Sequence, residues 1–118
     1  MNTNEYSILK IYASSTDKIG HKLLYEYIIK LAKERKLAGA TVFRGVMGFG
    51  QSSKKISSSK FWELTEKLPV LIELIDQTST LEDFYMEIEA HLQNMHKGCL
   101  VSMEPIQLKL LKPGRKHE

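Results

Sequence analysis

Three closely spaced glycines are the residues of this sequence whose type and spacing first suggest chemistry. The stretch GVMGFG places them at Gly45, Gly48 and Gly50. Glycine allows positive φ angles and close approach of a ligand, and successive backbone amides can then form a concave site for an anion. The stretch is neither a Walker loop nor a dinucleotide fingerprint, and a β-bulge or a strand end would also use these glycines. The sequence therefore leaves an anion site and a structural turn as alternatives.

Basic residues could contribute charge to such a site. Arg44 precedes the glycines in an apolar segment, where a charge needs a partner or an edge position. It could bind an anion or form a structural ion pair. Lys97 and Gly98 follow a predicted helix, where they could cap the helix or contact a phosphate. The lysines and serines of residues 51–60 favour a solvated flexible loop over an ordered anion site.

Other kinds of site have little support in the residue pattern. The four histidines are scattered, and the single cysteine, Cys99, is typical of a small buried hydrophobe without a disulfide partner. No triad, nucleophile elbow or carboxylate pair is present, so we expect neither a metal site nor enzymatic activity. The net charge of +3 is too small to indicate binding to nucleic acid.

The apolar pattern predicts the elements that must position these residues. Period-two and β-branched stretches indicate strands at 6–13, 40–49, 69–76 and 99–104, with short candidates at 60–64 and 106–111. Helical spacing indicates a first helix between Ile19 and Leu37, closed near Gly39. Ser15, Thr16 and Asp17 are its candidate caps. A second helix would begin with a capping box of Ser79 and Glu82 and end at Gly98.

The order of these elements is βαββαβ, which predicts the α+β, ferredoxin-like fold: an antiparallel sheet with two helices on one face. We expect a single domain over residues 1–118, with a core at about 6–111 and a flexible basic tail at 112–118. The strands carry large apolar residues on both sides, for example Ile72 and Leu71. A sheet covered on one face only should alternate more cleanly, so we expect copies of the chain to associate through the open face.

The chain lacks a signal-peptide pattern and any run of about 18 apolar residues. We therefore expect a cytoplasmic protein that is not embedded in a membrane.

Four stretches of this sequence form a recognisable set: IYASSTDKIGHKLLY from Ile11, LAGATVFRGVMGFG from Leu37, LPVLIELID from Leu68 and KGCLVSME from Lys97. Together they resemble an uncharacterised bacterial family, the domain of unknown function 190 type, which is related to the PII nitrogen-regulatory proteins. The resemblance covers roughly residues 9–104. It implies the PII-like form of the ferredoxin-like fold and assembly as a homotrimer.

In PII proteins, the strand that ends in GFG leads into an exposed effector arm, and adenine nucleotides bind in clefts between subunits. The resemblance implies ligand-binding roles for the base of the arm and for the turn after the second helix, at Gly48, Phe49, Gly50, Gln51, Lys97 and Gly98. Residues 51–60 would relay the ligand state to a partner protein, with contacts from Ser52, Ser53, Lys54, Lys55 and Ser57. Related genes beside fluoride exporters suggest a membrane transporter as that partner.

The sequence also departs from the PII pattern. After GFG it continues with QSSKKISSSK, which has no tyrosine for nucleotidylation, and the turn after the second helix is only HKG. The ligand is therefore predicted only as a small anion, with an adenine nucleotide as the first candidate and no certain cofactor. The alternative is a metal-responsive or structural trimer of the same fold, as in the related copper-tolerance proteins.

Overall fold

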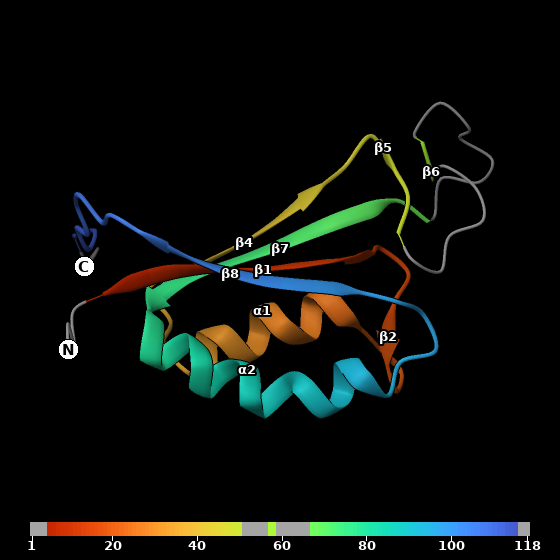
Figure 1. Ribbon diagram of the computed structural model, residues 1–118, viewed down its shortest axis with the longest axis horizontal. Helices are drawn as coiled ribbons and strands as arrows, with labels where there is room; N and C mark the ends of the chain where they lie inside the picture. The colour runs from red at the N-terminus through yellow and green to blue at the C-terminus, as the bar shows by residue number, and fades with distance from the viewer. Residues whose placement is uncertain (1–4, 51–56, 59–66, 116–118) are drawn as a thin grey trace.

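A computed structural model of the chain describes residues 5–50, 57–58 and 67–115. Its centre is a four-stranded antiparallel sheet in the order β4-β7-β1-β8, and both helices cover one face of this sheet (Figure 1). The strands are β1 (Tyr6–Ser14), β4 (Gly39–Arg44), β7 (Pro69–Gln77) and β8 (Leu100–Ile106), and the helices are α1 (Leu24–Glu34) and α2 (Thr78–Gln93). This arrangement confirms the predicted α+β, ferredoxin-like fold. No helix of the described ranges is long and apolar enough to cross a membrane.

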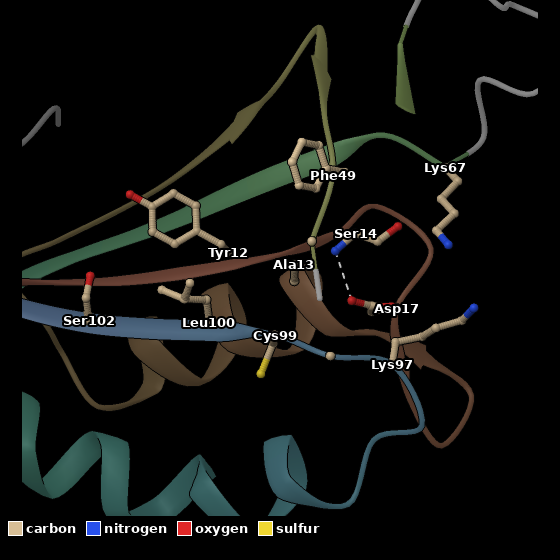
Figure 2. Close-up of a pocket in the computed structure, with 12 residues that line it drawn as sticks. Tyr12, Ala13, Ser14, Asp17, Phe49, Lys67, Lys97, Cys99, Leu100 and Ser102 are labelled. Carbon is tan, nitrogen blue, oxygen red and sulfur yellow. Dashed lines mark hydrogen bonds between the residues drawn. The ribbon is translucent and has the colours of Figure 1, made fainter. Parts of the chain in front are cut away.

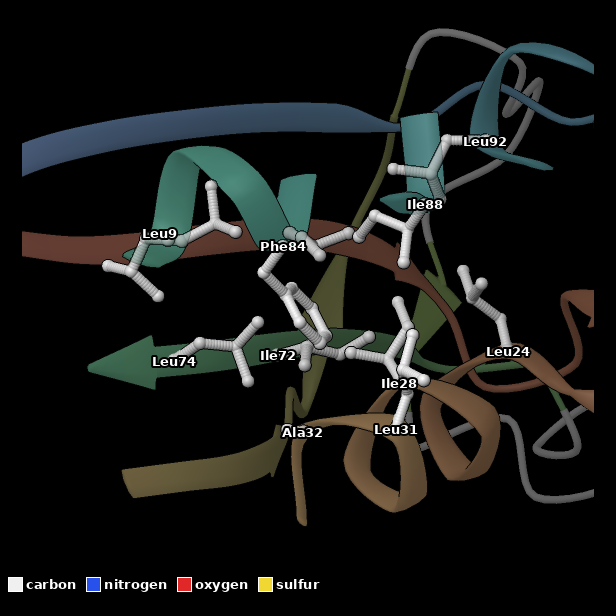
Figure 3. Packing of buried hydrophobic residues seen from close by; sticks show 12 residues of the cluster. Leu9, Leu24, Ile28, Leu31, Ala32, Ile72, Leu74, Phe84, Ile88 and Leu92 are labelled. Carbon is white, nitrogen blue, oxygen red and sulfur yellow. The ribbon is translucent and has the colours of Figure 1, made fainter. Parts of the chain in front are cut away.

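The core lies between the sheet and the two helices. Alternate residues of the two central strands, Leu9 and Ile11 in β1 and Ile72 and Leu74 in β7, point toward the helices and are buried. The helices contribute apolar residues to the core at a spacing of three or four, which places these residues on one face of each helix. Figure 3 shows how these side chains interdigitate. The buried cluster consists of Leu9, Ile11, Leu24, Ile28, Leu31, Ala32, Ile72, Leu74, Leu81, Phe84, Ile88 and Leu92.

The first helix begins later than the sequence predicts. Residues 18–23 form a small hairpin of β2 (Lys18–Ile19) and β3 (Lys22–Leu23), and α1 follows at Leu24. Gly20 has φ +61°, as the first residue of a two-residue hairpin loop often requires. The residue before the helix is Leu23, which has no capping side chain. The predicted caps are therefore wrong: the backbone carbonyl of Asp17 instead accepts the Leu24 N–H at 2.7 Å.

The same helix ends at Glu34, before Gly39, and a lysine in the left-handed conformation follows its cap residue Arg35. Lys36 has φ 60°, and its N–H donates to the carbonyl of Lys33, while the Leu37 N–H donates to that of Ala32. These two bonds form a Schellman motif, in which glycine is the usual residue. Leu37 then packs against the core, which explains why a lysine is tolerated at the strained position.

The second helix has neither predicted boundary. It begins at Thr78 with Gln77 before it, and no side chain caps its first turn, so the capping box of Ser79 and Glu82 is wrong. The Thr78 hydroxyl instead shares a 2.6 Å hydrogen bond with the buried Ser7 of β1. The helix ends at Gln93, before Gly98. On the outer surface, the Arg35 guanidinium bonds to Glu87 and lowers the pKa of that carboxyl.

The predicted strand at 40–49 is interrupted at Gly45. The N–H of Gly45 donates to the Pro69 carbonyl at 2.7 Å, and the chain then leaves the main sheet to form β5 (Met47–Gly48), which pairs with β6 (Ser57–Ser58). The candidate strand at 60–64 lies outside the described residues. The candidate terminal strand at 106–111 does not form, since β8 continues through Pro105 and ends at Ile106.

The sheet face opposite the helices carries a complete apolar row across the four strands. In the strand register, one line of neighbouring residues runs through Phe43, Leu71, Tyr12 and Leu100. The next line is polar and contains Lys10, whose amino group lies 2.7 Å from Glu104 Oε1. This carboxylate raises the pKa of Lys10. Within the part of the chain that is described, no element covers this open face (Figure 1).

Candidate functional site

A pocket of about 490 Å³ lies at one end of the sheet, where four separate segments meet. These segments are the end of β1 with its following turn, the residues after β5, the residue before Leu68, and the connection from α2 to β8. The pocket is therefore built from parts of the chain that are distant in sequence. Its lining residues are Tyr12, Ala13, Ser14, Asp17, Phe49, Gly50, Lys67, Lys97, Gly98, Cys99, Leu100 and Ser102.

Backbone hydrogen bonds fix the segments that surround the pocket. The Ser15 N–H donates to the Leu68 carbonyl at 2.7 Å, and the Leu68 N–H donates to the Ser15 hydroxyl at 2.9 Å. Both residues are buried, where such bonds are costly to lose. The connection between β4 and β7 is also held where it begins, because the Gly45 N–H donates to the Pro69 carbonyl. The described residues Gly45 and Leu68, before and after this part of the chain, are thus attached to the same framework as the pocket.

Asp17 is the acidic residue of the lining and is buried. One of its carboxylate oxygens accepts the Ser14 N–H at 2.9 Å, which closes the turn after β1 (Figure 2). Because a carboxylate has several acceptor positions, this bond leaves capacity for a ligand donor. Asp17 therefore has a structural role in the turn and also presents a hydrogen-bond acceptor to the pocket.

The two ends of the pocket differ in polarity. In Figure 2 the rings of Phe49 and Tyr12 lie to one side, and the side chains of Lys67 and Lys97 lie to the other. Leu100 adds to the apolar end. Lys67 precedes β7 and Lys97 follows α2, yet both side chains reach the same end of the pocket. Such an arrangement suits a ligand with a flat apolar part and an anionic part.

Cys99 lines the pocket beneath these residues and is half-buried. Burial is the larger cause and the nearby Asp17 carboxylate the smaller cause of a raised pKa for its thiol. A higher pKa leaves less of the reactive thiolate at neutral pH. We therefore regard Cys99 as a wall of the pocket rather than a nucleophile.

This pKa shift predicts slow alkylation of the folded protein. At pH 8 we expect iodoacetamide to label Cys99 several-fold more slowly in the native protein than in the protein unfolded in urea, as measured by mass spectrometry. The difference should shrink as the pH rises past the raised pKa, because the thiolate then forms in both states. Equal rates in both states at pH 8 would contradict the burial of this thiol.

The structure brings four of the predicted site residues together in this pocket: Phe49, Gly50, Lys97 and Gly98. Gly48 and Arg44 do not line it. Arg44 is the exposed last residue of β4 and forms no ion pair within the described part of the chain, so the structural ion pair considered for it is not found. Five further predicted residues lie outside the described part of the chain: Gln51, Ser52, Ser53, Lys54 and Lys55. Ser57 belongs to the short strand β6.

Sequence reasoning missed several lining residues. Tyr12 was assigned only to a strand, Asp17 only to a helix cap, and Lys67 to no role. Asp17 lies within one of the stretches that resemble the uncharacterised family, so that resemblance was the one signal that could have indicated it. Among the residues that the structure describes, no group of three or more histidine, cysteine, aspartate or glutamate side chains could hold a metal ion.

Comparison with known proteins gives a consistent result for sequence and fold. The family model DUF190, described as "Uncharacterized ACR", matches residues 6–108. A UPF0166 protein of Aquifex aeolicus (strain VF5) is 34% identical over 108 residues, which is 92% of this chain and 97% of that protein. A UPF0166 protein of Methanocaldococcus jannaschii is 38% identical over 69 residues, which is 58% of this chain and 62% of the relative.

Solved structures with a similar fold include CPII from Thiomonas intermedia K12, described as a nitrogen regulatory PII-like protein. The structure of CPII bound to ADP, AMP and acetate has a TM-score of 0.59 at 12% identity, covering 90% of each chain. The structure of CPII bound to ADP, AMP and bicarbonate has a TM-score of 0.56 at 13% identity, covering 86% of this chain and 88% of that one. At this identity the likeness concerns the fold.

Proposed function

The chain belongs to the uncharacterised PII-like family DUF190, and on that premise we propose that it is a non-enzymatic regulatory protein that binds a small anionic ligand in this pocket. An adenine nucleotide is the first candidate. The proposal rests mainly on one observation: the pocket has an aromatic end at Phe49 and Tyr12 and a cationic end at Lys67 and Lys97.

The chemistry of a nucleotide matches these two ends. A purine ring stacks on aromatic side chains, which contributes roughly 1–3 kcal/mol per base in single-stranded nucleic acid complexes. Phosphate oxygens accept hydrogen bonds from lysine amino groups such as those of Lys67 and Lys97. The carboxylate of Asp17 can accept a hydrogen bond from a ribose hydroxyl. CPII, whose fold is similar, binds ADP and AMP, and this supports the choice of ligand.

The pocket also extends onto the face through which copies of the chain would associate. Tyr12 and Leu100 line the pocket and belong to the apolar row of the open sheet face. A second copy on that face would close the apolar side of the pocket. We therefore propose that the ligand binds in clefts between the subunits of a cytoplasmic homotrimer.

A ligand in this position would contact both ends of residues 51–66. Phe49 and Gly50 precede this segment and Lys67 follows it, and all three line the pocket. Binding would change the conformation of residues 51–60, and a partner protein would then recognise the ligand state through this segment. A membrane transporter is the partner that the resemblance suggests.

Isothermal titration with ADP and AMP tests the proposal. We expect saturable binding to the native protein and a loss of at least about tenfold in affinity for Lys97→Glu and for Lys67→Glu, since a hydrogen bond to a charged group contributes ~1.5–3 kcal/mol. Phe49→Ala should weaken binding of both nucleotides but not of inorganic phosphate.

The matched control is Lys112→Glu, which makes the same change of charge at an exposed position outside the pocket. It should bind both nucleotides as the native protein does. The site would be ruled out if the native protein bound neither ADP nor AMP. It would also be ruled out if Lys97→Glu and Lys112→Glu bound these nucleotides with equal affinity. Circular dichroism would confirm that each variant is folded.

A further inference from the structure

The residues that follow β8 have the pattern of a strand but no strand partner. After Ile106, the last residue of β8, residues 107–111 read QLKLL, with leucines at 108 and 110, polar residues at 107 and 109, and a further leucine at 111. This alternation is typical of a strand with one buried face. Nevertheless, residues 107–115 belong to no helix or strand, and they take part in none of the backbone hydrogen bonds found among the described residues.

The apolar side chains of this segment are left in solvent. Leu108, Leu110 and Leu111 are 37%, 76% and 51% exposed. Burying apolar side chains stabilises a protein, and Leu108 and Leu110, which would share one side of a strand, do not gain this stabilisation while they are exposed. Single exposed apolar residues are common on protein surfaces, whereas a contiguous patterned run indicates a binding partner.

The sheet offers two outer edges for such a partner, and they differ. The outer strands are β4 and β8. β8 contains Pro105, which has no N–H, and an edge strand tolerates proline where the donor would point away from the sheet. Proline on the outer side discourages further pairing. β4 has no proline, and its six residues Gly39–Arg44 keep their outward donors and acceptors.

The segment and the β4 edge are similar in length and compatible in side chains. The unpaired residues 107–111 could lie along most of the six residues of β4, Gly39–Arg44. Phe43 of β4 is half-exposed on the open face, and a leucine beside it on an added strand would form a favourable cross-strand pair. In Figure 1 the chain after β8 runs past the end of the sheet rather than back toward β4 of the same molecule.

We propose that residues 107–111 add as a strand to the outer edge of β4 in a second copy of this chain. The added segment and the β4 edge are different surfaces of the molecule, so each copy contributes one segment to a neighbour and binds one segment from another neighbour. Such a head-to-tail contact closes into a ring when the rotation between copies allows it. This inference concerns how copies are joined, and it does not depend on the ligand that the pocket binds.

A double variant of the apolar positions tests the contact. We expect Leu108→Asp/Leu110→Asp to sediment as a monomer where the native chain sediments as an oligomer. Hydrogen exchange should report the loss of this contact at β4, the strand to which the segment would be added. Amides of residues 39–44 that are protected in the native protein should exchange at least about tenfold faster in the variant, because the added strand no longer bonds to them.

The control places the same substitutions on the polar side of the segment. Gln107→Asp/Lys109→Asp should retain the native sedimentation and the protection of residues 39–44, since these side chains would face solvent. A monomeric native protein would overturn the inference. Unchanged assembly in Leu108→Asp/Leu110→Asp would also overturn it. The same holds if the double substitution speeds hydrogen exchange of the β8 amides and not of the β4 amides.

These outcomes can be separated from a failure of the proposed function. None of the four substituted positions lines the pocket. A native protein that binds ADP or AMP but assembles without this segment loses only the present inference. A protein that assembles through the segment but binds neither nucleotide loses only the proposed function.

Discussion

Replacement of Ile72 by alanine is expected to lower the free energy of unfolding by about 2–5 kcal/mol. Ile72 lies in the central strand β7 and is 0% exposed, with Ile11 opposite it in β1 and Val42 opposite it in β4. Its side chain contacts the cluster between sheet and helices. Truncation removes buried methyl groups and leaves a cavity that a central strand cannot close. Urea denaturation followed by circular dichroism would measure the loss.

The matched control is Met86→Ala, since Met86 lies on α2 and is 72% exposed. Its effect should stay within about 0.5 kcal/mol, as is usual for exposed positions. Both proteins should be compared at one concentration, because association would add to the apparent stability. A loss for Ile72→Ala no larger than that for Met86→Ala would show that the core is placed wrongly.

The second large effect is expected for Gly45→Ala. A Cβ at this position would lie 2.9 Å from Pro69 Cγ and 3.3 Å from the Pro69 carbonyl oxygen. Neither atom can move easily, because one belongs to a proline ring and the other accepts the Gly45 N–H at 2.7 Å. Overpacking of this kind costs typically about 1–3 kcal/mol. We expect a loss of that size in thermal or urea unfolding.

Gly39→Ala is the matched control at the other end of β4. A Cβ there would meet no atom within 4 Å, so the change in stability should be within about 0.5 kcal/mol. If the two glycine variants were equally stable, the close approach of Gly45 to Pro69 would be refuted. This pair also tests the structural alternative for the GVMGFG stretch, in which Gly45 has a role at the strand end.

The fold could be predicted because its central elements are defined by long apolar patterns. β1 and β7 carry alternating core residues, and both helices carry apolar residues at a spacing of three or four, so the type and order of the four main strands and the two helices could be predicted. Boundaries were less predictable. The hairpin before α1 depends on two residue pairs and a glycine turn, and the start of α2 depends on a hydrogen bond between Ser7 and Thr78, which are distant in sequence.

The candidate site could be predicted only in part, for a related reason. Phe49 and Gly50 belong to a conspicuous glycine stretch, and Lys97 and Gly98 to a recognisable turn. Lys67 belongs to no pattern and reaches the pocket because the Ser15 and Leu68 hydrogen bonds hold its segment there. A residue that is placed by contacts distant in sequence gives no local signal.

The shared position of Tyr12 and Leu100, in the pocket wall and in the apolar row, links two equilibria thermodynamically. A molecule bound in the pocket and a second chain on the open face would touch the same two side chains. Each event then alters the free energy of the other, and the coupling has equal magnitude in both directions. The apparent dissociation constant of a ligand would therefore vary with protein concentration. The ligand would in turn change the constant for association between chains by the same factor.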